Sequence, residues 1–515
     1  MMGRAPIAAT GWVLLAILAV VPFVTLLGEM FFPGGELSFA SLGTVLDEER
    51  EWELFANTLG LGVGSAAGAL FLGVTCACVV ARSQSSLAKL VRSLLVVPLL
   101  IPPLVHAIAW TTASELRGPA AMVVVLSLAY FPMVAVLTTA SLESIDRRQE
   151  EAALLAGGER ARVRLALRLA APSALSGAVA VFVFAVSDFA VPDYLSTVGT
   201  KVNVYANEIF TRWQREGDSG GAIAAALPPA ALAALAMAGL SVFRRRGGSV
   251  TISSAGFQTP LPLAIGRWRV VAVGGVILTF LLSCVIPIAC LLYTAGSVSV
   301  IQEALSQARG EVLRSMGCAA AAAALATVVA FVVCWSTIRR GVVGERAVEV
   351  IALLPMALPA IALGVGLIRT WNRPGPASWV YDGPAIVVAA FAARFLVFAH
   401  TSAIAGLAAQ SPDLEDSARI AGVSPWRRMW SIAAPVAAPS IASAALLVFL
   451  FSMRELDAIV LIPQGNRSVL FRIYNAIHFN RPQFVAALSL VLVFLTAAPW
   501  LLWRVALGRR MELPQ

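Results

Sequence analysis

Charged residues are scarce in this chain: Asp, Glu, Lys and Arg make up only 13% of its 515 residues, and its two lysines are Lys89 and Lys201. Neither lysine lies in a G-x4-G-K-[ST] motif, which argues against a phosphate-cradling loop in this sequence. The three histidines are isolated, and no set of His, Cys and carboxylate residues has metal-ligand spacing. No Ser/His/Asp or Cys/His grouping indicates a hydrolase. The sequence therefore predicts no enzyme, no cofactor and no protein-built metal site.

The six cysteines do not indicate a disulfide framework. All of them lie inside apolar segments, where a cysteine behaves as a small hydrophobic residue. Cys76 and Cys78 are close in sequence, but a helix would turn their thiols to different faces. A soft-metal site there is the disfavoured alternative.

Hydrophobic residues make up 59% of the chain, and its mean hydropathy is +0.83. This composition is typical of a polytopic membrane protein. A hydrocarbon core about 30 Å thick needs about 20 apolar residues per helix. That criterion predicts twelve spans, beginning near Trp12, Leu59, Leu94, Ala120, Leu175, Ala222, Val270, Ala319, Val348, Ile386, Ile441 and Val485. The first run, Gly11 to Phe32, is long enough to span and lacks a small-residue cleavage site, which favours an uncleaved helix over a signal peptide.

One polar segment occurs twice in this apolar chain. It reads E-A-A-L-L-A-G from Glu151 to Gly157 and D-S-A-R-I-A-G from Asp416 to Gly422. About half the chain separates the copies, as expected if one unit had been duplicated and fused. Twelve spans then divide into two halves of six, which enter the membrane in the same orientation because six is even. The predicted domains are a first half at 1–247, a linker at 248–267 and a second half at 268–515, with the repeated loops at 143–172 and 408–435.

Arginine and lysine residues collect on one side of this topology, together with both repeated loops. They are Arg82, Lys89, Arg92, Arg244 to Arg246, Arg339, Arg340, Arg504, Arg509 and Arg510. The positive-inside rule therefore predicts that both termini and both loops are cytoplasmic, with the acidic cluster Asp47 to Glu53 outside. The formal charge of +9 is a topological signal, because the basic residues are dispersed and form no single stripe for nucleic acid.

The duplicated segment resembles the EAA loop, E-A-A-x3-G-x9-I-x-L-P, of the fused permeases of type I binding-protein-dependent ABC importers. Glu151 to Gly157 matches its opening residue for residue but has two extra residues before Pro172, and Asp416 to Pro435 keeps its full spacing. The resemblance implies an all-α polytopic membrane protein of the bacterial inner membrane, with twelve transmembrane helices in two parallel six-helix halves. The partners it implies are two ATP-binding cassette subunits, which hydrolyse the ATP, and a soluble periplasmic or extracellular substrate-binding protein. The ATPase-coupling residues it implies are Glu151, Ala152, Ala153, Gly157, Asp416, Ser417, Ala418, Gly422 and Pro435.

The residues of the loop also suit docking on chemical grounds. Small side chains let a short helix lie close to a partner, and Gly157 and Gly422 can turn the chain with a positive φ at little cost. Glu151 and Asp416, near the helix starts, suit the helix dipole. The neighbouring arginines, which offer donors to acidic groups, are Arg160, Arg162, Arg164, Arg168, Arg419, Arg427 and Arg428. The alternative is a solvated loop held by lipid phosphates, which the duplication disfavours.

Charges recur in the span that follows each loop, and these are the candidate gate residues: Asp188 in the first half, and Arg454, Glu455 and Asp457 in the second. The sequence predicts that each lies within a helix. A charge at the centre of a membrane helix costs about 3 kcal/mol on insertion scales, so these groups should face protein or a water-filled path. A pore-lining gate is favoured, and a structural ion pair between the halves is the alternative.

Prolines recur in the third and ninth spans, as Pro98-x3-Pro102-Pro103 and Pro355-x3-Pro359. Proline removes a helix hydrogen bond and kinks the helix. The kinks at Pro102 and Pro359 either line the central path or serve ordinary packing. Arg394, in the tenth span, should be paired within the bundle.

Four longer loops, at 33–53, 196–221, 300–314 and 463–482, are predicted to face outside as a landing surface for the binding protein. Residues there that mix charge with aromatic rings, as docking surfaces do, are Tyr205, Asn207, Glu208, Arg212, Trp213, Arg215, Arg467, Arg472, Tyr474, Asn475 and His478.

The cargo is suggested by resemblance alone. The fused form, with S-D-F-A-V-P at Ser187 to Pro192 and E-I-F at Glu208 to Phe210, looks most like ferric-iron permeases. Importers of thiamine, phosphonate, polyamine and sulfate have related permeases and stay open. An ion-coupled secondary transporter is the alternative of another class. The polar loop between the fourth and fifth spans of each half argues against it, as does the lack of a duplicated charged motif after the second span.

Overall fold

The computed structural model of the protein describes residues 6–32, 36–39, 43, 49–82, 86–246, 258–262, 268–340, 344–463 and 465–508. Every regular element in these ranges is a helix or a helical turn. Of the predicted linker 248–267, residues 258–262 are described. Asp47, Glu48, Arg509 and Arg510 lie outside the described residues.

The described helices account for twelve spans when each bent pair is counted as one. Nine are long and apolar enough to cross a membrane: Ala9–Phe31, Arg50–Arg82, Gly118–Glu143, Arg147–Ser187, Ser219–Arg244, Val270–Ala295, Arg309–Arg339, Pro425–Arg454 and Pro482–Leu502. Three more are bent pairs: Leu90–Leu100 with Pro103–Ala113, Glu345–Ala357 with Ala360–Trp371, and Ala385–Arg394 with Leu396–Ala408. The twelve-span prediction is confirmed, with three of the spans broken.

The chain forms two compact units, and unit 2 comprises Glu49–Asn207 and Pro228–Gly296. Its core is built from α4 (Glu49–Arg82), α7 (Gly118–Glu143) and α8 (Arg147–Ser187). A Cβ atom on Gly73 of α4 or Gly177 of α8 would lie 2.6 Å from an atom of Val134 in α7, so glycine lets the three backbones approach closely. The other helices are α5 (Ser86–Leu94), the 3-10 turn Val97–Leu100, α6 (Pro103–Ala113), α9 (Ala190–Val198), α12 (Leu227–Arg246), α13 (Trp268–Phe280), the π-turn Leu281–Val285 and α14 (Ile286–Ala295).

Unit 1 comprises Met1–Glu48, Glu208–Leu227 and Ser297–Gln515. Its core is built from α16 (Arg309–Arg340), α21 (Leu396–Ala408) and α24 (Ala434–Arg454). The elements before this core are α1 (Pro6–Leu15), the π-turn Ala16–Val20, α2 (Val21–Phe31), the end of α10 (Tyr205–Thr211), the π-turn Arg212–Glu216, α11 (Ser219–Ala225) and α15 (Val298–Gln307). The others are α17 (Glu345–Ala357), α18 (Ala360–Trp371), α19 (Pro376–Asp382), α20 (Ala385–Arg394), α22 (Pro412–Ile420), α23 (Pro425–Arg428), the π-turn Met429–Ala433, the 3-10 turn Gly465–Arg467, α25 (Val469–His478) and α26 (Pro482–Gly508).

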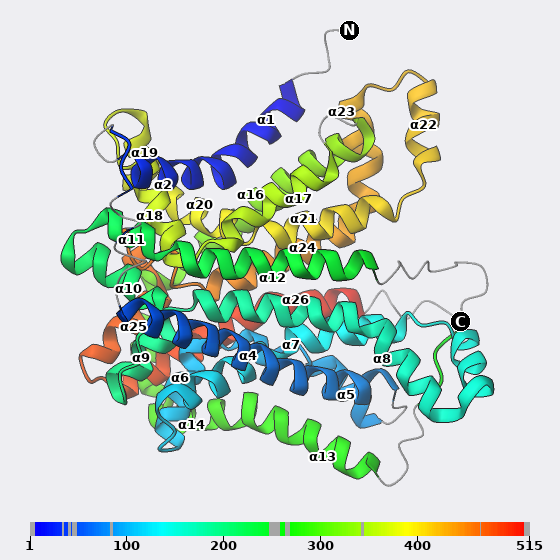
Figure 1. Cartoon of the computed structure of the whole chain (residues 1–515), viewed down its shortest axis with the longest axis horizontal. Helices are drawn as coiled ribbons and strands as arrows, with labels where there is room; N and C mark the ends of the chain where they lie inside the picture. Colours follow the sequence, from blue (N-terminus) through cyan, green and yellow to red (C-terminus); the bar gives the residue numbers. More distant parts are fainter. Residues whose placement is uncertain are drawn as a thin grey trace. The chain divides into compact units, whose positions relative to one another are not determined.

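The opening helices of each predicted half pack with helices of the other half. In unit 1, α1 and α2 lie against α16 and α18, and in unit 2, α13 and α14 lie against α4 and α6 (Figure 1). The contact is close, since a Cβ atom on Gly366 of α18 would lie 2.9 Å from the carbonyl oxygen of Pro22 in α2. The compact units therefore differ in composition from the two halves of the sequence repeat, whose boundaries stay a prediction.

Candidate functional site

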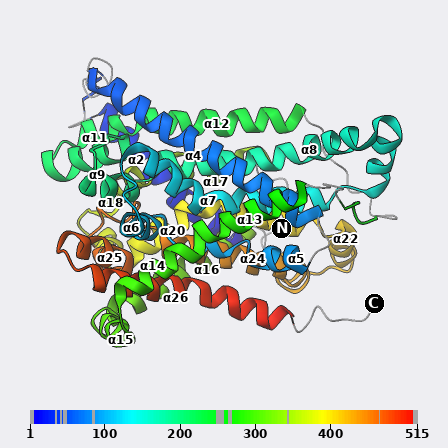
Figure 2. The same cartoon turned by 90° about the horizontal axis from the view of Figure 1, so that it is seen from below.

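The first repeated segment forms the N-terminal part of α8 and turns sharply at a glycine pair. The helix begins at Arg147 because the side chain of Asp146 accepts a hydrogen bond from the backbone N–H of Arg148 at 2.8 Å. The helical dihedral angles fail at Gly157 and Gly158, and α8 bends there (Figure 2). Gly158 has the positive φ, 69°, whereas Gly157 is extended at −167°. The prediction that Gly157 supplies the left-handed turn is therefore wrong by one residue, because its neighbour also lacks a Cβ atom.

The second repeated segment forms a separate helix, α22, which ends in a turn at Gly422. Ser411 caps its start by accepting a hydrogen bond from the backbone N–H of Asp413. At its end, the N–H of Val423 donates to the carbonyl oxygen of Ala418 at 2.9 Å, and Gly422 has the predicted positive φ of 76°. The chain then enters α23, and Pro435 lies exposed near the start of α24.

The arm of α8 before the glycine turn, residues 147–157, and helix α22 are named the coupling helices after their predicted role. One apolar residue on each coupling helix is almost fully exposed. Leu155 is 91% exposed and Ile420 is 86% exposed. Each follows the acidic residue of its repeat, Glu151 or Asp416, by four positions. Two large apolar side chains held outward at the same place in a repeat indicate contact surfaces for a partner. Sequence reasoning missed them, although an apolar residue at the same place in both copies of a polar segment was a usable signal.

Eight of the nine predicted coupling residues lie in the same two repeated segments as these side chains, and Pro435 follows in α24. Both acidic residues form exposed ion pairs within their own helix, Glu151 with Arg147 at 2.7 Å and Asp416 with Arg419 at 3.2 Å. Exposed pairs of this kind stabilise a helix by less than about 1 kcal/mol, so both carboxylates stay available to a partner. All nine predicted coupling residues are exposed or half-buried: Glu151, Ala152, Ala153, Gly157, Asp416, Ser417, Ala418, Gly422 and Pro435. Arg162 differs from its predicted role, because it is buried and bonded to Glu159.

The candidate gate carboxylates lie where the span after each loop ends. In unit 2, α8 ends at Ser187, and Oδ1 of Asp188 accepts a hydrogen bond from the backbone N–H of Val191 at 2.9 Å. In unit 1, α24 ends at Arg454, and Oε1 of Glu455 accepts one from Ala458 at 2.9 Å. The prediction that the gate residues lie within helices holds for Arg454, the last residue of α24, and is wrong for Asp188, Glu455 and Asp457. Each carboxylate stabilises the point where the helix is interrupted, because it accepts a hydrogen bond from a backbone N–H that has no helical carbonyl partner.

Arg454 and Asp457 flank the second break. The Arg454 side chain is buried, with its guanidinium carbon 5.6 Å from the centroid of the Phe451 ring, and Asp457 is half-buried. Buried ionisable groups are costly in a membrane protein and are characteristic of paired or functional sites. Both breaks therefore remain candidates for the gate.

Removing the Asp188 carboxylate is expected to impair transport without preventing membrane insertion. Asp188→Ala loses the cap and the charge, whereas Asp188→Asn keeps an oxygen for the Val191 N–H and loses only the charge. If the charge belongs to the gate, both variants should lower uptake roughly tenfold, a change of about 1.4 kcal/mol in the rate-limiting barrier. Uptake into whole cells, normalised to the amount of inserted protein, measures this. Wild-type uptake by Asp188→Asn would show that the carboxylate serves only as a helix cap.

The recurrent prolines mark breaks in the third and ninth spans. The two parts of the third span meet at 94° around Pro102, and those of the ninth meet at 101° around Pro359. The predicted kinks are thus confirmed, and each is a bend of about a right angle. At the break in the ninth span, the buried side chain of Arg394, the last residue of α20, donates through Nη1 to the carbonyl oxygens of Leu358, at 2.8 Å, and of Pro355 and Met356, at 3.4 Å each. This guanidinium satisfies the carbonyl groups that the end of α17 leaves without helical partners.

Comparison with known protein families gives the same two-part pattern. Residues 69–247 and 322–512 both match the family described as binding-protein-dependent transport system inner membrane component. The chain belongs to this family. It is a multi-pass membrane permease of a binding-protein-dependent ABC importer, in the fused, double-length form. The family assignment decides against the ion-coupled secondary transporter.

Individual relatives of the permease carry different cargo names. A putative 2-aminoethylphosphonate transport system permease protein of Salmonella paratyphi A is 31% identical over 158 residues, which are 30% of this chain and 58% of that protein. A molybdate/tungstate transport system permease protein of Thermococcus kodakarensis is 29% identical over 171 residues, 32% of this chain and 67% of that protein. An Fe(3+)-transport system permease protein of Haemophilus influenzae is 22% identical over 473 residues, 88% of this chain and 90% of that protein. Of these three relatives, the iron permease is the one that aligns over nearly its whole length.

Residues 471–481 of segment 463–482 supply most of the lining of an open hollow of about 510 Å³ in unit 1. Its lining mixes charge with aromatic rings: Glu311, Phe471, Arg472, Asn475, Ala476, Phe479, Arg481 and Phe484. Arg472 forms an ion pair with Glu311 and lies over the Phe484 ring. Three of the docking residues predicted in segment 196–221 are not at the surface. Tyr205, Glu208 and Arg212 are buried, and Glu208 is ion-paired with Arg212 at 2.8 Å. They hold α10 in place and are not available to a soluble partner.

Proposed function

We propose that this permease is moved by two ATP-binding cassette subunits, which dock on its two coupling segments, and that it passes ferric iron from a soluble binding protein into the cytoplasm. The observation that carries the first part is the pair of outward apolar residues, Leu155 and Ile420, at the same place in both repeats. A folded chain gains nothing from exposing them, whereas a partner with an apolar cleft would bury both. Separate ATPase subunits account for the absence of a phosphate-binding motif in this sequence.

The surroundings of these residues support docking of a short helix. Small or short side chains at Ala152, Ala153, Ser417 and Ala418 let a partner surface come close to each coupling helix. Carboxylates and arginines at the rim supply polar contacts that steer the encounter more than they strengthen it. In this arrangement both coupling segments and both termini face the cytoplasm, on the side where arginine and lysine collect. The membrane is then the inner membrane of a bacterial cell.

Ferric iron as cargo is supported by the extent of one alignment. The Fe(3+) permease of Haemophilus influenzae aligns with 88% of this chain, whereas the phosphonate and molybdate/tungstate permeases align with about a third of it. A sulfate permease also aligns with 29% of the chain, so phosphonate, molybdate and sulfate are the competing cargoes. The breaks at Asp188 and Glu455 are proposed to act as the gate through which the cargo passes.

Two measurements test this function. The detergent-solubilised permease is captured from its native membrane through a tag, and the proteins that accompany it are identified. Recovery of an ATPase with two copies per permease is expected, and an intact permease preparation that consistently lacks an ATPase would contradict the coupling proposal. Cells with and without the permease gene are then compared for uptake of radiolabelled ferric iron, molybdate, sulfate and 2-aminoethylphosphonate. Loss of uptake of one of the other three, with iron uptake unchanged, would replace iron as the cargo.

A further inference from the structure

A buried carboxylate lies immediately before each acidic residue of the repeat. In the first half it is Glu150, whose Oε1 lies 2.9 Å from Nη1 of Arg82, the last residue of α4. The side chains of the pair are 2% and 1% exposed. Burial of two charges with this little exposure is costly unless both are held in good geometry, so the pair is a specific contact between the two helices. It joins the start of the coupling helix to the end of α4.

The second half repeats this contact. Oε1 of Glu415 lies 3.1 Å from Nε of Arg339, the penultimate residue of α16. The side chains are 4% and 16% exposed. Glu150 and Glu415 are both the fourth residue of their helix, α8 or α22, counted from the capping residue. The two coupling helices are thus attached through the same position to the end of an earlier long helix, α4 for α8 and α16 for α22.

The second carboxylate oxygen of each pair accepts a neutral N–H, and here the halves differ. Oε2 of Glu415 accepts from the indole Nε1 of Trp335, one turn before Arg339 in α16, at 3.1 Å. Oε2 of Glu150 accepts from the backbone N–H of Leu261 at 2.7 Å, and Leu261 lies between the two halves of the repeat. The carbonyl oxygen of Leu261 accepts from Arg82 in return, at 3.3 Å. A segment of the linker therefore takes the place in the first half that a tryptophan holds in the second.

Further hydrogen bonds hold this linker segment, 258–262, to the first coupling segment. The carbonyl oxygen of Pro262 accepts from Nη1 of Arg162 at 3.0 Å, and that of Gln258 accepts from the backbone N–H of Arg147 at 3.2 Å. Arg147 and Arg162 lie on opposite sides of the glycine turn in α8. The linker segment therefore braces both arms of that turn.

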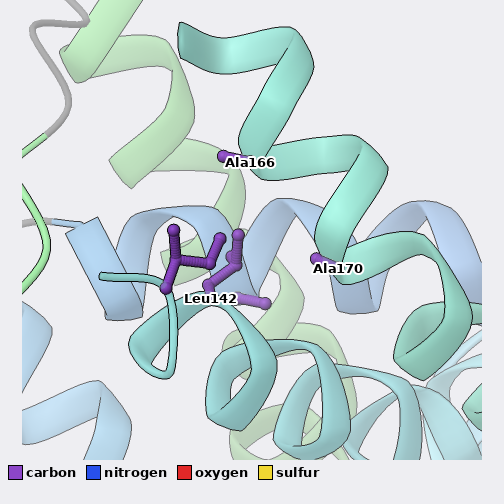
Figure 3. Packing of buried hydrophobic residues seen from close by; sticks show 5 residues of the cluster. Leu142, Ala166 and Ala170 are labelled. Carbon is purple, nitrogen blue, oxygen red and sulfur yellow. The ribbon is translucent and has the colours of Figure 1, made fainter. Parts of the chain in front are cut away.

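Beyond the turn, α8 rests on an apolar cluster. Ala77 of α4, Leu142 of α7 and Ile145 pack with Ala166 and Ala170 of α8. Figure 3 shows Leu142 between the neighbouring helices, with Ala166 and Ala170 on the α8 ribbon. Close packing transmits displacement because its elements move as bodies and resist local compression. The polar contact at Glu150 and this cluster thus attach α8 to α4 at two levels.

We infer that Glu150 and Glu415 are positioning residues that carry motion of the coupling helices into α4 and α16. This inference rests on the proposed function, because an ATPase supplies the motion. Each carboxylate bridges a cation and a neutral N–H donor, so the coupling helix and the end of the long helix move together. We call each buried carboxylate together with its two donors a joint. In the first half, the linker segment 258–262 supplies one of these donors, the N–H of Leu261. Glu151 and Asp416, one residue on, are partly exposed and available to the partner. In each half, one of two adjacent carboxylates therefore serves docking, and the other passes the motion on to the long helix.

Glu150→Gln and Glu415→Gln test the joint with little change of shape. A glutamine has one acceptor oxygen in place of two, and its NH2 group must face either the arginine or the neutral N–H donor. Glu143→Gln is the matched control, because Glu143 forms an exposed ion pair with Arg92 at the end of α7. The permease with its co-purified ATPase is placed in liposomes with the binding protein, and uptake of radiolabelled ferric iron is measured per ATP hydrolysed. We expect both test variants to keep the ATPase and its hydrolysis but to lower this ratio roughly tenfold, the scale of coupling changes along such networks. Glu143→Gln should match wild type.

Amide exchange on the purified permease alone supplies a readout that needs neither ATPase nor cargo. Glu150→Gln should speed exchange in residues 147–157 and at the end of α4, and Glu143→Gln should not. If Glu150→Gln does not accumulate, Leu261→Pro removes the N–H donated to Glu150, and Leu261→Ala is the control that loses the leucine side chain but keeps this N–H. Exchange unchanged in the test variant, or an unchanged ratio of uptake to hydrolysis, would overturn the joint. Failure to recover any ATPase with wild type would instead contradict the proposed function.

Discussion

Replacing both Leu155 and Ile420 by aspartate is expected to detach the ATPase subunits while leaving the permease folded. Both side chains are almost fully exposed in the chain itself, so the substitutions remove no internal packing. In a complex, burial of each side chain contributes about 1.5–3 kcal/mol, and a buried unpaired carboxylate adds a further cost. Together the two changes should weaken the complex by roughly three orders of magnitude. The amount of ATPase recovered with the tagged permease from native membranes measures the effect.

The matched control for this experiment keeps both contacts apolar. Leu155→Met with Ile420→Leu alters the shape of the two side chains slightly and should retain the ATPase, because volume-conserving apolar changes cost little. Each single aspartate variant should retain part of the binding, since the other coupling segment is intact. Size-exclusion chromatography shows whether the double aspartate variant is folded. Wild-type recovery of ATPase with a well-folded double variant would mean that docking uses another surface.

Arg394→Met is expected to destabilise the permease more than any exposed arginine substitution. Arg394 is 1% exposed, and its guanidinium donates to three carbonyl oxygens at the break between α17 and α18. Methionine occupies a similar volume but donates no hydrogen bond, so those carbonyl oxygens lose their donor in a region that water does not reach. A buried polar group left without its partner costs about 1–3 kcal/mol, and the total here should be about 3 kcal/mol or more. The midpoint of thermal unfolding in detergent should therefore fall.

Arg373→Met is the control for this substitution. Arg373 lies just past the end of α18, is exposed, and donates to the carbonyl oxygen of Arg369. Water can replace that bond, so the unfolding midpoint should stay at the wild-type value. An equally stable Arg394→Met protein would show that packing around Pro359 holds the break without the guanidinium.

Most of the architecture follows from local properties of the sequence. Apolar run length predicted all twelve spans, and recurrent proline predicted the bends at Pro102 and Pro359, because helix length and backbone hydrogen bonding are decided within a few residues. The duplicated motif located both coupling segments, and both of their turns use a glycine with positive φ. The first of these turns was placed one residue early, since two adjacent glycines are equally permissive and only the bonded neighbours choose between them.

The sequence by itself determined that this protein is a duplicated membrane permease with two copies of one polar loop. Only the tertiary structure decided which charges face inward and which helices belong together. Glu150 and Glu151 are identical in type and adjacent, yet one is buried against Arg82 and the other is half exposed beside Arg147. The pairing of α1 and α2 with α16 and α18 likewise depends on contacts between residues hundreds of positions apart. Such contacts depend on the fit of side chains across helix surfaces, which composition and periodicity within one segment do not record.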